Sequence, residues 1–265
     1  MSRVDIENLT ANEKLKPAGS SVSLRPVESS PTTTVPTVEP LKRGEALWLE
    51  LKSAEISVML LASTFVLAAS YRNWWSIGVA EAWGFVTGGI CVWLVVREHM
   101  WNWPIGLANN LFFFVLFLRG RLYADMGLQI VYLGLGVYGW LNWIFGGKNH
   151  TALNITRTTK AEWIVLSISV PLCTWGMHEI LVMLNDAAPF WDALTTVLSL
   201  AAQYMLCRKR FENWWFWIAA DVIYIPLYFS RELPLTAILY AVFLSMCLVG
   251  VREWSLNLRK GDGAP

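Results

Sequence analysis

The chain has 265 residues, of which 55% are hydrophobic and 15% are charged, and its formal net charge at pH 7 is +1. It contains 16 tryptophans, and its mean hydropathy is +0.43. Soluble domains carry about a quarter charged residues, so this composition predicts a protein whose solvent is the lipid bilayer. The balanced charge gives no case for a nucleic-acid partner.

The first segment, residues 1–48, is rich in Ser, Thr, Pro and Glu and contains no apolar run. Such a segment does not bury enough apolar surface to fold by itself. We expect a disordered cytoplasmic tail here, with no cleavable signal peptide before the first apolar segment.

Eight apolar segments follow the tail. A helix needs about 20 mostly apolar residues to cross the roughly 30 Å hydrocarbon core of a bilayer, and these segments meet or nearly meet that length. They are too long and too uniformly apolar to alternate as the strands of a membrane barrel do. The sequence therefore predicts an all-α, polytopic membrane protein with eight transmembrane helices. The expected helices span about 53–71, 77–96, 102–118, 123–145, 161–182, 189–207, 213–230 and 234–251.

Lys and Arg residues are distributed unequally between the two sides of this predicted membrane. If the N-terminus lies on side one, that side carries 13 Lys and Arg residues even without the far N-terminal tail, and the other side carries four. Cytoplasmic loops are enriched in Lys and Arg. The bias predicts that both termini are cytoplasmic.

Two stretches of the chain, 102–143 and 213–254, align without a gap at an offset of 111 residues and share ten of 42 positions. Arg97 and Arg208 extend the register backwards. The repeat predicts two three-helix bundles. One linker helix between them lets the second bundle enter the membrane in the same orientation as the first, so the repeats are parallel.

Internal repeats in a very apolar chain are typical of membrane transporters, in which two similar bundles move around a central path. We therefore expect a transporter built from four membrane segments and a C-terminal tail. These are an extra N-terminal helix at 49–72, a first bundle at 76–146, a linker helix at 160–183, a second bundle at 188–254 and a cytoplasmic tail at 255–265.

A polar residue lies at the middle of the central helix of each repeat, Asn110 in the first and Asp221 in the second. An acid that faces lipid at this depth costs on the order of a few kcal/mol, so it faces a polar cavity or a partner. Trp103 and Trp217 lie on the same helix faces as these residues. All four are candidates for a substrate site. The alternatives are that Trp103 and Trp214 belong to an interfacial aromatic belt, and that Asp221 hydrogen-bonds a neighbouring helix.

Gln129 and Tyr132 form one stripe of the next helix, and an amide and a phenol at mid-depth suit a hydroxylated ligand. The second repeat has Tyr240 where the first has Gln129, and Trp217 where the first has Gly106. These differences favour a single asymmetric site over two equal ones. The expected substrate-binding residues are Trp103, Asn110, Gln129, Tyr132, Trp217, Asp221, Tyr224 and Tyr240.

Motifs for covalent chemistry are absent from the sequence, which has no Gly-rich phosphate loop, no Ser-His-Asp grouping and no HExxH. The 4 cysteines lie in apolar segments without paired spacing, and the 3 histidines are scattered. We therefore expect no enzymatic activity, no cofactor and no metal.

Two runs carry a family resemblance. They are WNWPIGLANNLFFFVLFLRGRLYADMGLQIVYLGLGVYGW in the first repeat and ENWWFWIAAD in the second. Over about residues 80–254 the chain resembles the PnuC family of bacterial vitamin transporters, whose typical member takes up nicotinamide riboside. The resemblance implies a three plus one plus three arrangement similar to the SWEET sugar transporters. It also implies a location in the bacterial inner membrane, a homotrimer, and facilitated diffusion of the riboside, which a cytoplasmic nicotinamide riboside kinase then traps by phosphorylation.

The residues leave several alternatives open. Relatives of this family take up thiamine or riboflavin, and both vitamins present rings on which tryptophan can stack. A sugar transporter of the SWEET kind is a different substrate class on the same architecture. A membrane scaffold or a lipid-modifying enzyme would leave the repeat and its paired polar positions unexplained. Coupling to protons or sodium is also open.

Overall fold

The computed structural model describes residues 53–72, 74, 78–121 and 123–262. Apart from an isolated bridge between Thr156 and Arg210, the regular structure in these ranges is helical, which confirms the all-α prediction there. The predicted tail at 1–48 and the start of the extra helix lie outside the described residues. The helices are α2 (Ser53–Tyr71), α3 (Val79–Val96), α4 (Asn102–Gly120), α5 (Tyr123–Phe145), η1 (Lys148–His150, a 3-10 turn), α6 (Lys160–Met183), α7 (Pro189–Cys207), α8 (Asn213–Ser230) and α9 (Pro234–Asp262).

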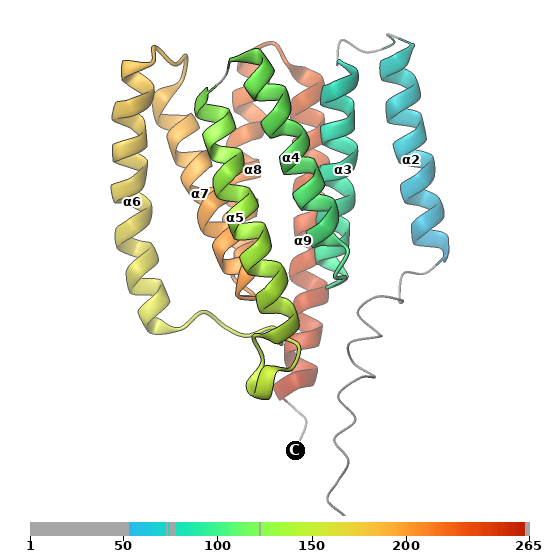
Figure 1. Ribbon diagram of the computed structural model, residues 1–265, viewed down its shortest axis with the longest axis vertical. Coiled ribbons are helices and arrows are strands. Elements are labelled where there is room, and N and C mark those ends of the chain that lie inside the picture. Colours follow the sequence, from blue (N-terminus) through green and yellow to red (C-terminus); the bar gives the residue numbers. More distant parts are fainter. Residues whose placement is uncertain (1–52, 73, 75–77, 122, 263–265) are drawn as a thin grey trace, which may run out of the picture. The chain divides into compact units, whose positions relative to one another are not determined.

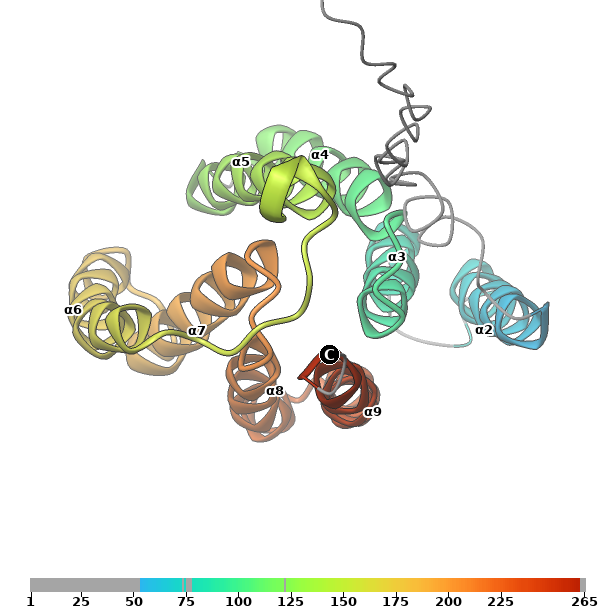
Figure 2. The ribbon, with the colours of Figure 1, turned by 90° about the horizontal axis from the view of Figure 1, so that it is seen from below.

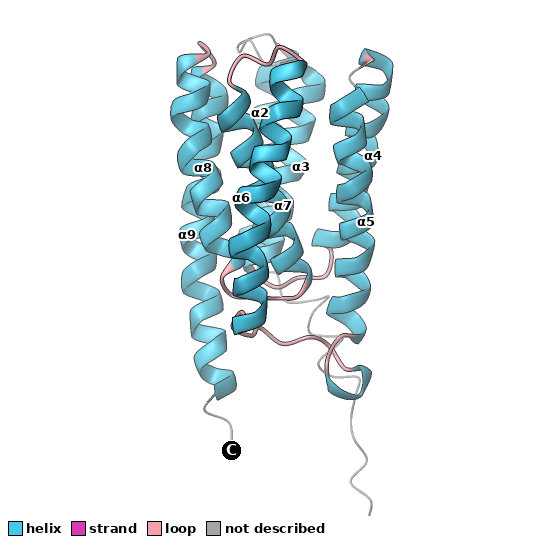
Figure 3. Ribbon diagram, turned by 90° about the vertical axis from the view of Figure 1, so that its left-hand side faces the viewer, coloured by secondary structure: helices cyan, strands magenta, loops and turns pink. Residues whose placement is uncertain are grey.

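Five α-helices in the described part of the chain, α2, α4, α5, α6 and α9, are long and apolar enough to cross a membrane by length and composition. A shorter apolar stretch, Ala82–Val96, lies in α3. The helices run alongside one another, and the loops gather at their two ends (Figure 1 and Figure 3). This agrees with a multi-pass membrane protein. We call the end at which α3, α5, α7 and α9 finish the lower end, as in Figure 1.

Six helices form a closed ring. Around it, α3 packs against α4, α4 against α5, α5 against α7, α7 against α8, α8 against α9, and α9 against α3. The two remaining helices lie outside this ring, where α2 packs against α3 and α6 packs against α7 (Figure 2). The ring therefore consists of three consecutive helices before α6, α3 to α5, and three after it, α7 to α9.

Four tryptophans form the centre of the core, towards the lower end of the ring. Trp103 and Trp143 meet edge to face with ring centroids 5.3 Å apart, and Trp214 and Trp254 meet in the same way at 5.4 Å. The rings of Trp143 and Trp254 are 6.3 Å apart, which joins the two pairs. The members of each pair are separated by the same interval in sequence, and each side chain is at most 3% exposed. Edge-to-face packing of this kind adds stability beyond simple area burial.

The indole N–H groups of this core hydrogen-bond across the ring. Trp143 Nε1 donates to the carbonyl of Leu206 at 2.9 Å, and Trp254 Nε1 donates to the carbonyl of Val95 at 3.0 Å. Both acceptors lie in the last turn of a helix, where carbonyl groups lack a full set of intrahelical partners. Each repeat therefore caps a helix of the other repeat.

The residues just after α3 and α7 adopt the left-handed backbone conformation, with φ of 54° at Glu98 and 51° at Lys209. These residues end their helices in matching ways, because His99 N donates to the Leu94 carbonyl and Arg210 N donates to the Met205 carbonyl, as in a Schellman motif. The Lys209 ammonium also pairs with the Glu98 carboxylate at 2.7 Å. This ion pair joins the two repeats at the lower end.

One glycine in each repeat, Gly139 and Gly250, lies directly against a tryptophan of the core. A Cβ atom on Gly139 of α5 would overlap the ring of Trp103, and one on Gly250 of α9 would lie 2.5 Å from the ring of Trp214. Small residues at helix contacts let membrane helices approach closely. Both positions hold glycine because a larger side chain would collide with the tryptophan that faces it.

Helix α9 extends beyond the predicted end of the last apolar segment at 251 and continues to Asp262. The predicted C-terminal tail at 255–265 is therefore helical over most of its length. Residues beyond 251 are more polar, and a polar helix is not recognised by a count of apolar residues. Trp254 and Leu258 are buried, and Asn257 Nδ2 donates to Glu98 Oε1 at 2.8 Å, so this part of the helix packs against the lower end.

Candidate functional site

A cavity of about 450 Å³ lies inside the helix ring. All six ring helices contribute lining residues, whereas neither α2 nor α6 contributes a described residue to this wall. Trp103 and Trp214 of the tryptophan core also line the cavity, so the core forms one of its boundaries. A small molecule held here would touch both repeats.

All eight residues that the sequence singled out lie on the wall of this one cavity. They are Trp103, Asn110, Gln129, Tyr132, Trp217, Asp221, Tyr224 and Tyr240. They come from four helices, α4, α5, α8 and α9. The structure thus brings them together, although they are distant in sequence.

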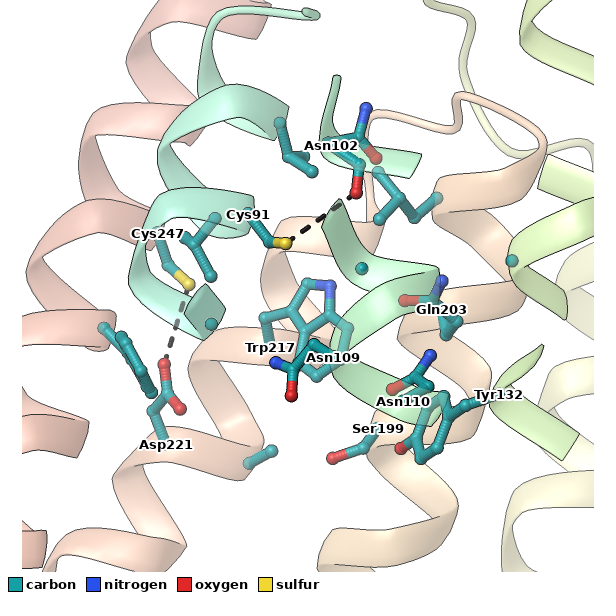
Figure 4. Close-up of a pocket in the computed structure, with 18 of the residues that line it drawn as sticks. Cys91, Asn102, Asn109, Asn110, Tyr132, Ser199, Gln203, Trp217, Asp221 and Cys247 are labelled. Carbon is teal, nitrogen blue, oxygen red and sulfur yellow. Dashed lines mark hydrogen bonds between the residues drawn. The ribbon is translucent and has the colours of Figure 1, made fainter. Parts of the chain in front are cut away.

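The two mid-helix polar residues, Asn110 and Asp221, occupy different surroundings. The Asp221 side chain is 5% exposed and lies beside α9, where the Cys247 thiol donates to its Oδ2 atom at 3.6 Å (Figure 4). A thiol is a weak donor. The cavity therefore contains a buried carboxylate with spare capacity to accept hydrogen bonds. Asn110 instead lies on the opposite side of the site, near Tyr132 (Figure 4).

A group of uncharged polar side chains forms one side of the cavity. Asn110 of α4, Tyr132 of α5, and Ser199 and Gln203 of α7 gather there, and the Tyr132 hydroxyl lies next to that of Ser199 (Figure 4). Together they offer amide donors and acceptors and two hydroxyl groups. Such a wall suits a ligand with several hydroxyl or amide groups.

Tyr224, Tyr240 and Phe243 contribute aromatic rings to another part of the wall. Tyr224 and Tyr240 have ring centroids 4.6 Å apart, and Tyr228 stacks on Tyr240 at 5.1 Å with an interplanar angle of 15°. Phe243 meets Tyr240 edge to face at 5.7 Å. Trp217 lies between Asp221 and Asn110, close to Asn109 (Figure 4). Ring faces of this kind attract flat, and especially cationic, ligands.

Three polar atoms of cavity-lining residues are buried and lack a hydrogen-bond partner within the described part of the protein. They are Asn109 Oδ1, Trp103 Nε1 and Trp214 Nε1. Buried polar groups are nearly always paired with protein, water or ligand. These atoms therefore offer one acceptor and two donors to whatever fills the cavity.

The cavity wall contains an acidic side chain but, among its described residues, no basic one. Asp221 is the acid among the described residues that line it, and the same set contains no Lys, Arg or His. Phosphate recognition in proteins relies on Arg, Lys and helix N-termini. This wall is thus better suited to a cation or a neutral molecule than to a phosphate ester.

Some lining residues escaped the sequence reasoning. Asn109 was passed over beside Asn110, and Ser199 and Gln203 lie on α7, a helix in which no site residue was predicted. The last two are spaced by four residues and form a polar stripe on one helix face. That spacing is the signal that could have revealed them.

The interfacial-belt interpretation of Trp103 and Trp214 is wrong. Their side chains are 3% and 1% exposed, and both point into the helix ring. A belt residue would lie on the outer surface at the level of the lipid headgroups. Their position near helix ends places them in the tryptophan core instead.

A comparison with models of protein families shows which family the chain belongs to. Residues 78–256 match the model of a family described as nicotinamide mononucleotide transporter. The chain belongs to this family. The match begins at the N-terminus of α3 and ends within α9, so it covers the whole helix ring together with α6.

Individual relatives agree with the family. The nicotinamide riboside transporter PnuC of Escherichia coli (strain K12) is 26% identical over 211 residues, which cover 68% of this chain and 86% of the relative. The riboflavin/roseoflavin transporter RibM of Streptomyces davaonensis is 25% identical over 216 residues, which cover 78% of this chain and 98% of the relative. The chain is thus similar to relatives that are named for two different vitamins.

A solved structure shares the fold. The crystal structure of the vitamin B3 transporter PnuC superposes with a TM-score of 0.62 at 22% identity and covers 82% of this chain and 97% of the other. This similarity extends well beyond the ring helices. It identifies the architecture of the chain as that of a PnuC-type transporter.

Proposed function

We propose that this protein is a membrane transporter for the uptake of nicotinamide riboside. The observation that carries the proposal is the cavity inside the helix ring, which combines an amide and hydroxyl wall, an aromatic wall and one buried acid without basic residues. Several relatives bear the name nicotinamide riboside transporter. We expect transport without chemical conversion and without a cofactor or metal.

The riboside has a flat cationic ring, a carboxamide and a ribose with free hydroxyl groups. We infer that its ring stacks near Trp217 and the tyrosines of α8 and α9, where a desolvated cation–π contact contributes about 0.5–2 kcal/mol. The polar wall around Asn110 and Gln129 then binds the carboxamide and ribose. Asp221 balances the positive charge of the ring. The eight predicted residues and Asn109 are the proposed binding residues.

The same wall argues against the phosphorylated mononucleotide as the preferred ligand. A phosphate group would enter a buried site that presents Asp221 and, among its described lining residues, no basic side chain. Burial of a charge without a partner of opposite sign costs much free energy. Riboside uptake followed by phosphorylation by a cytoplasmic riboside kinase fits this charge pattern.

Two alternatives remain within the same fold. Thiamine is also cationic and aromatic, whereas riboflavin is larger and uncharged, and one relative is named a riboflavin/roseoflavin transporter. A sugar, as in SWEET transporters, would form hydrogen bonds with the polar wall. The aromatic rings of Tyr224, Tyr228 and Tyr240 would then have no role in binding. Asp221 favours the cationic vitamins over the neutral ones.

A calorimetric titration of the purified protein tests the proposal. We would compare nicotinamide riboside, nicotinamide mononucleotide, thiamine and riboflavin under the same conditions. Binding of the riboside, with much weaker binding of the other three, is the expected result. Preference for thiamine or riboflavin would reassign the substrate, and equal binding of the riboside and the mononucleotide would contradict the charge argument.

We further propose that all eight helices cross the membrane as two parallel three-helix repeats, α3–α5 and α7–α9, with α6 as the linker and α2 as an extra helix. Four matching pairs of contacts support this arrangement: the tryptophan pairs, the indole hydrogen bonds across the ring, the helix ends at Glu98 and Lys209, and the glycines at 139 and 250. Each member of a pair is displaced by 111 residues from its counterpart.

Orientation and assembly follow the sequence-based prediction. The lower end carries Arg97, Lys148, Arg157 and Arg208, and the positive-inside rule assigns such an end to the cytoplasm. We propose a bacterial inner-membrane location with both termini in the cytoplasm, and a homotrimer. Transport is proposed to be facilitated diffusion, with the two repeats alternately closing above and below the cavity.

A further inference from the structure

A second cavity, of about 600 Å³, lies outside the helix ring between α2, α3 and α9. None of the eight proposed substrate residues lines it. Figure 2 shows that α2 stands on the outer side of α3, away from the centre of the ring. The cavity therefore separates the extra helix from the body of the transporter, and it faces the bilayer.

The walls of this outer cavity are apolar except at one end. They are formed by one face of each helix, from Glu55 to Val66 on α2, from Phe85 to Arg97 on α3, and from Leu239 to Met246 on α9. The helix rises about 16 Å from Glu55 to Val66, over eleven steps of about 1.5 Å each. This is about half of the roughly 30 Å hydrocarbon core, which is the depth of one lipid leaflet.

Three polar side chains gather at the lower end of the outer cavity. Arg97 pairs with the carboxylate of Glu55 on α2, and its other terminal nitrogen lies 3.7 Å from Glu253 on α9. Three further atoms are buried and unpartnered among the described residues, namely Glu55 Oε2, Trp93 Nε1 and Arg97 Nε. One acceptor and two donors thus lie together where the apolar walls end. Buried groups of this kind require a partner.

We propose that the outer cavity binds one phosphatidylethanolamine molecule from the leaflet at the lower end. Its acyl chain lies along the apolar walls, and its phosphate accepts hydrogen bonds from Arg97 Nε and Trp93 Nε1. Its ammonium group donates to Glu55 Oε2. The charges of Arg97, Glu55 and Glu253 are +1, −1 and −1, which sum to −1, so a zwitterionic lipid with an ammonium group is favoured over an anionic one.

The bound lipid explains how α2 is held to the ring. In the described part of the chain this helix packs against α3, and its large apolar side chains Leu60 and Leu61 are 63% and 72% exposed to the surroundings. Its direct contact with the ring is therefore narrow. A lipid in the outer cavity fills the space between α2 and α9 and connects them through van der Waals contact.

Lipid retention during purification tests this proposal independently of the vitamin substrate. The protein is extracted from a bacterial membrane in a mild detergent, and retained phosphatidylethanolamine and phosphatidylglycerol are counted by native mass spectrometry. Ala62→Trp fills the outer cavity, whereas Leu61→Trp adds the same ring to the exposed face of α2. We expect Ala62→Trp to lower retained phosphatidylethanolamine about tenfold and Leu61→Trp to leave it unchanged.

A charge variant distinguishes a specific headgroup site from general lipid adhesion. Glu55→Gln keeps the shape of the side chain and removes the partner of the ammonium group. We expect this variant to lose the preference for phosphatidylethanolamine over phosphatidylglycerol and to keep its acyl-chain binding. Equal retention of both lipids by the unmodified protein, or equal retention by the two tryptophan variants, would overturn the proposal. Thermal unfolding in detergent confirms that each variant is folded.

Discussion

Asp221 is an acid, whereas the matching residue of the first repeat is the neutral Asn110. The carboxylate is buried, and the partner seen for it is the weakly donating Cys247 thiol. A buried carboxylate of this kind is costly unless a cation or further donors reach it. A cationic substrate supplies that partner, and this gives the residue a role that a structural hydrogen bond alone would not require.

Replacement of Asp221 by Asn tests this role. We expect the riboside to bind about tenfold to a hundredfold more weakly, because a hydrogen bond to a charged group contributes about 1.5–3 kcal/mol. Calorimetric titration measures the change, and thermal unfolding in detergent shows that the variant is folded. Asp125→Asn is the matched control, since Asp125 is an exposed acid outside the cavity wall. Unchanged affinity in a folded Asp221 variant would remove this residue from the site.

The paired glycines lead to a second prediction at the residue scale. Gly139→Ala and Gly250→Ala should each destabilise the protein by about 1–3 kcal/mol, because the added methyl group meets Trp103 or Trp214 in a closely packed core. Gly134→Ala is the control, since no atom lies within 4 Å of its added Cβ. That change should be neutral or stabilising, by up to about 1 kcal/mol. Thermal unfolding measures all three, and similar values for all would contradict the packing argument.

The sequence predicted the site residues well where a polar side chain interrupts an apolar helix, as at Asn110, Asp221 and Gln129. The cost of exposing such a group to lipid makes each of them informative by itself. It missed Ser199 and Gln203 on α7, although their four-residue spacing places them on one helix face. Which face of α7 borders the cavity depends on the packing of the ring, and a single sequence does not specify that packing.

At the scale of elements, apolar length located the helices of the ring closely but misjudged the end of α9. The length of an apolar run predicts which part of a helix contacts lipid. The helix itself continues beyond the apolar run when its polar side chains have hydrogen-bond partners. Asn257 has such a partner in Glu98. The orientation of neighbouring helices, by contrast, was accessible from the repeat, because one offset relates helix ends, tryptophans and glycines.

The ion pair between Lys209 and Glu98 links the ends of α7 and α3. Lys209 is 3% exposed, and its ammonium group also donates to the Leu153 carbonyl at 3.1 Å and lies 4.5 Å from the centre of the Trp143 ring. The cation is therefore surrounded on several sides by specific partners. Removal of one member of such a pair leaves the other charge without compensation.

A double-mutant cycle measures the importance of this link. We expect Lys209→Met to lower the free energy of unfolding by about 1–3 kcal/mol, and Glu98→Gln to lower it as well. The double variant should lose less than the sum of the two single changes, because no unpaired charge then remains. Arg259→Met is the control, as it removes an exposed basic residue from α9. Strict additivity would show that the pair contributes no coupling.

At the scale of the whole molecule, the hydrogen bonds between the two halves concentrate at the lower end. Trp143 and Trp254 cross the ring there, Asn142 Nδ2 donates to the Cys207 carbonyl at 2.8 Å, and Lys209 pairs with Glu98. The cavity lies above this group of contacts, with the tryptophan core beneath it. For a transporter of the proposed orientation, these contacts must separate before substrate can leave towards the cytoplasm.

The energy source for transport gives the last prediction. Facilitated diffusion requires no coupled ion, and the cavity wall presents Asp221 as the acid among its described lining residues, which the substrate cation occupies in the proposed complex. We expect liposomes that contain the purified protein to accumulate labelled riboside to equal internal and external concentrations, at the same rate with and without an imposed pH gradient. Preloaded unlabelled riboside should accelerate entry by exchange. Accumulation above the external concentration when the gradient is present would instead assign a proton to Asp221, and Asp221→Asn would then abolish accumulation while exchange continued.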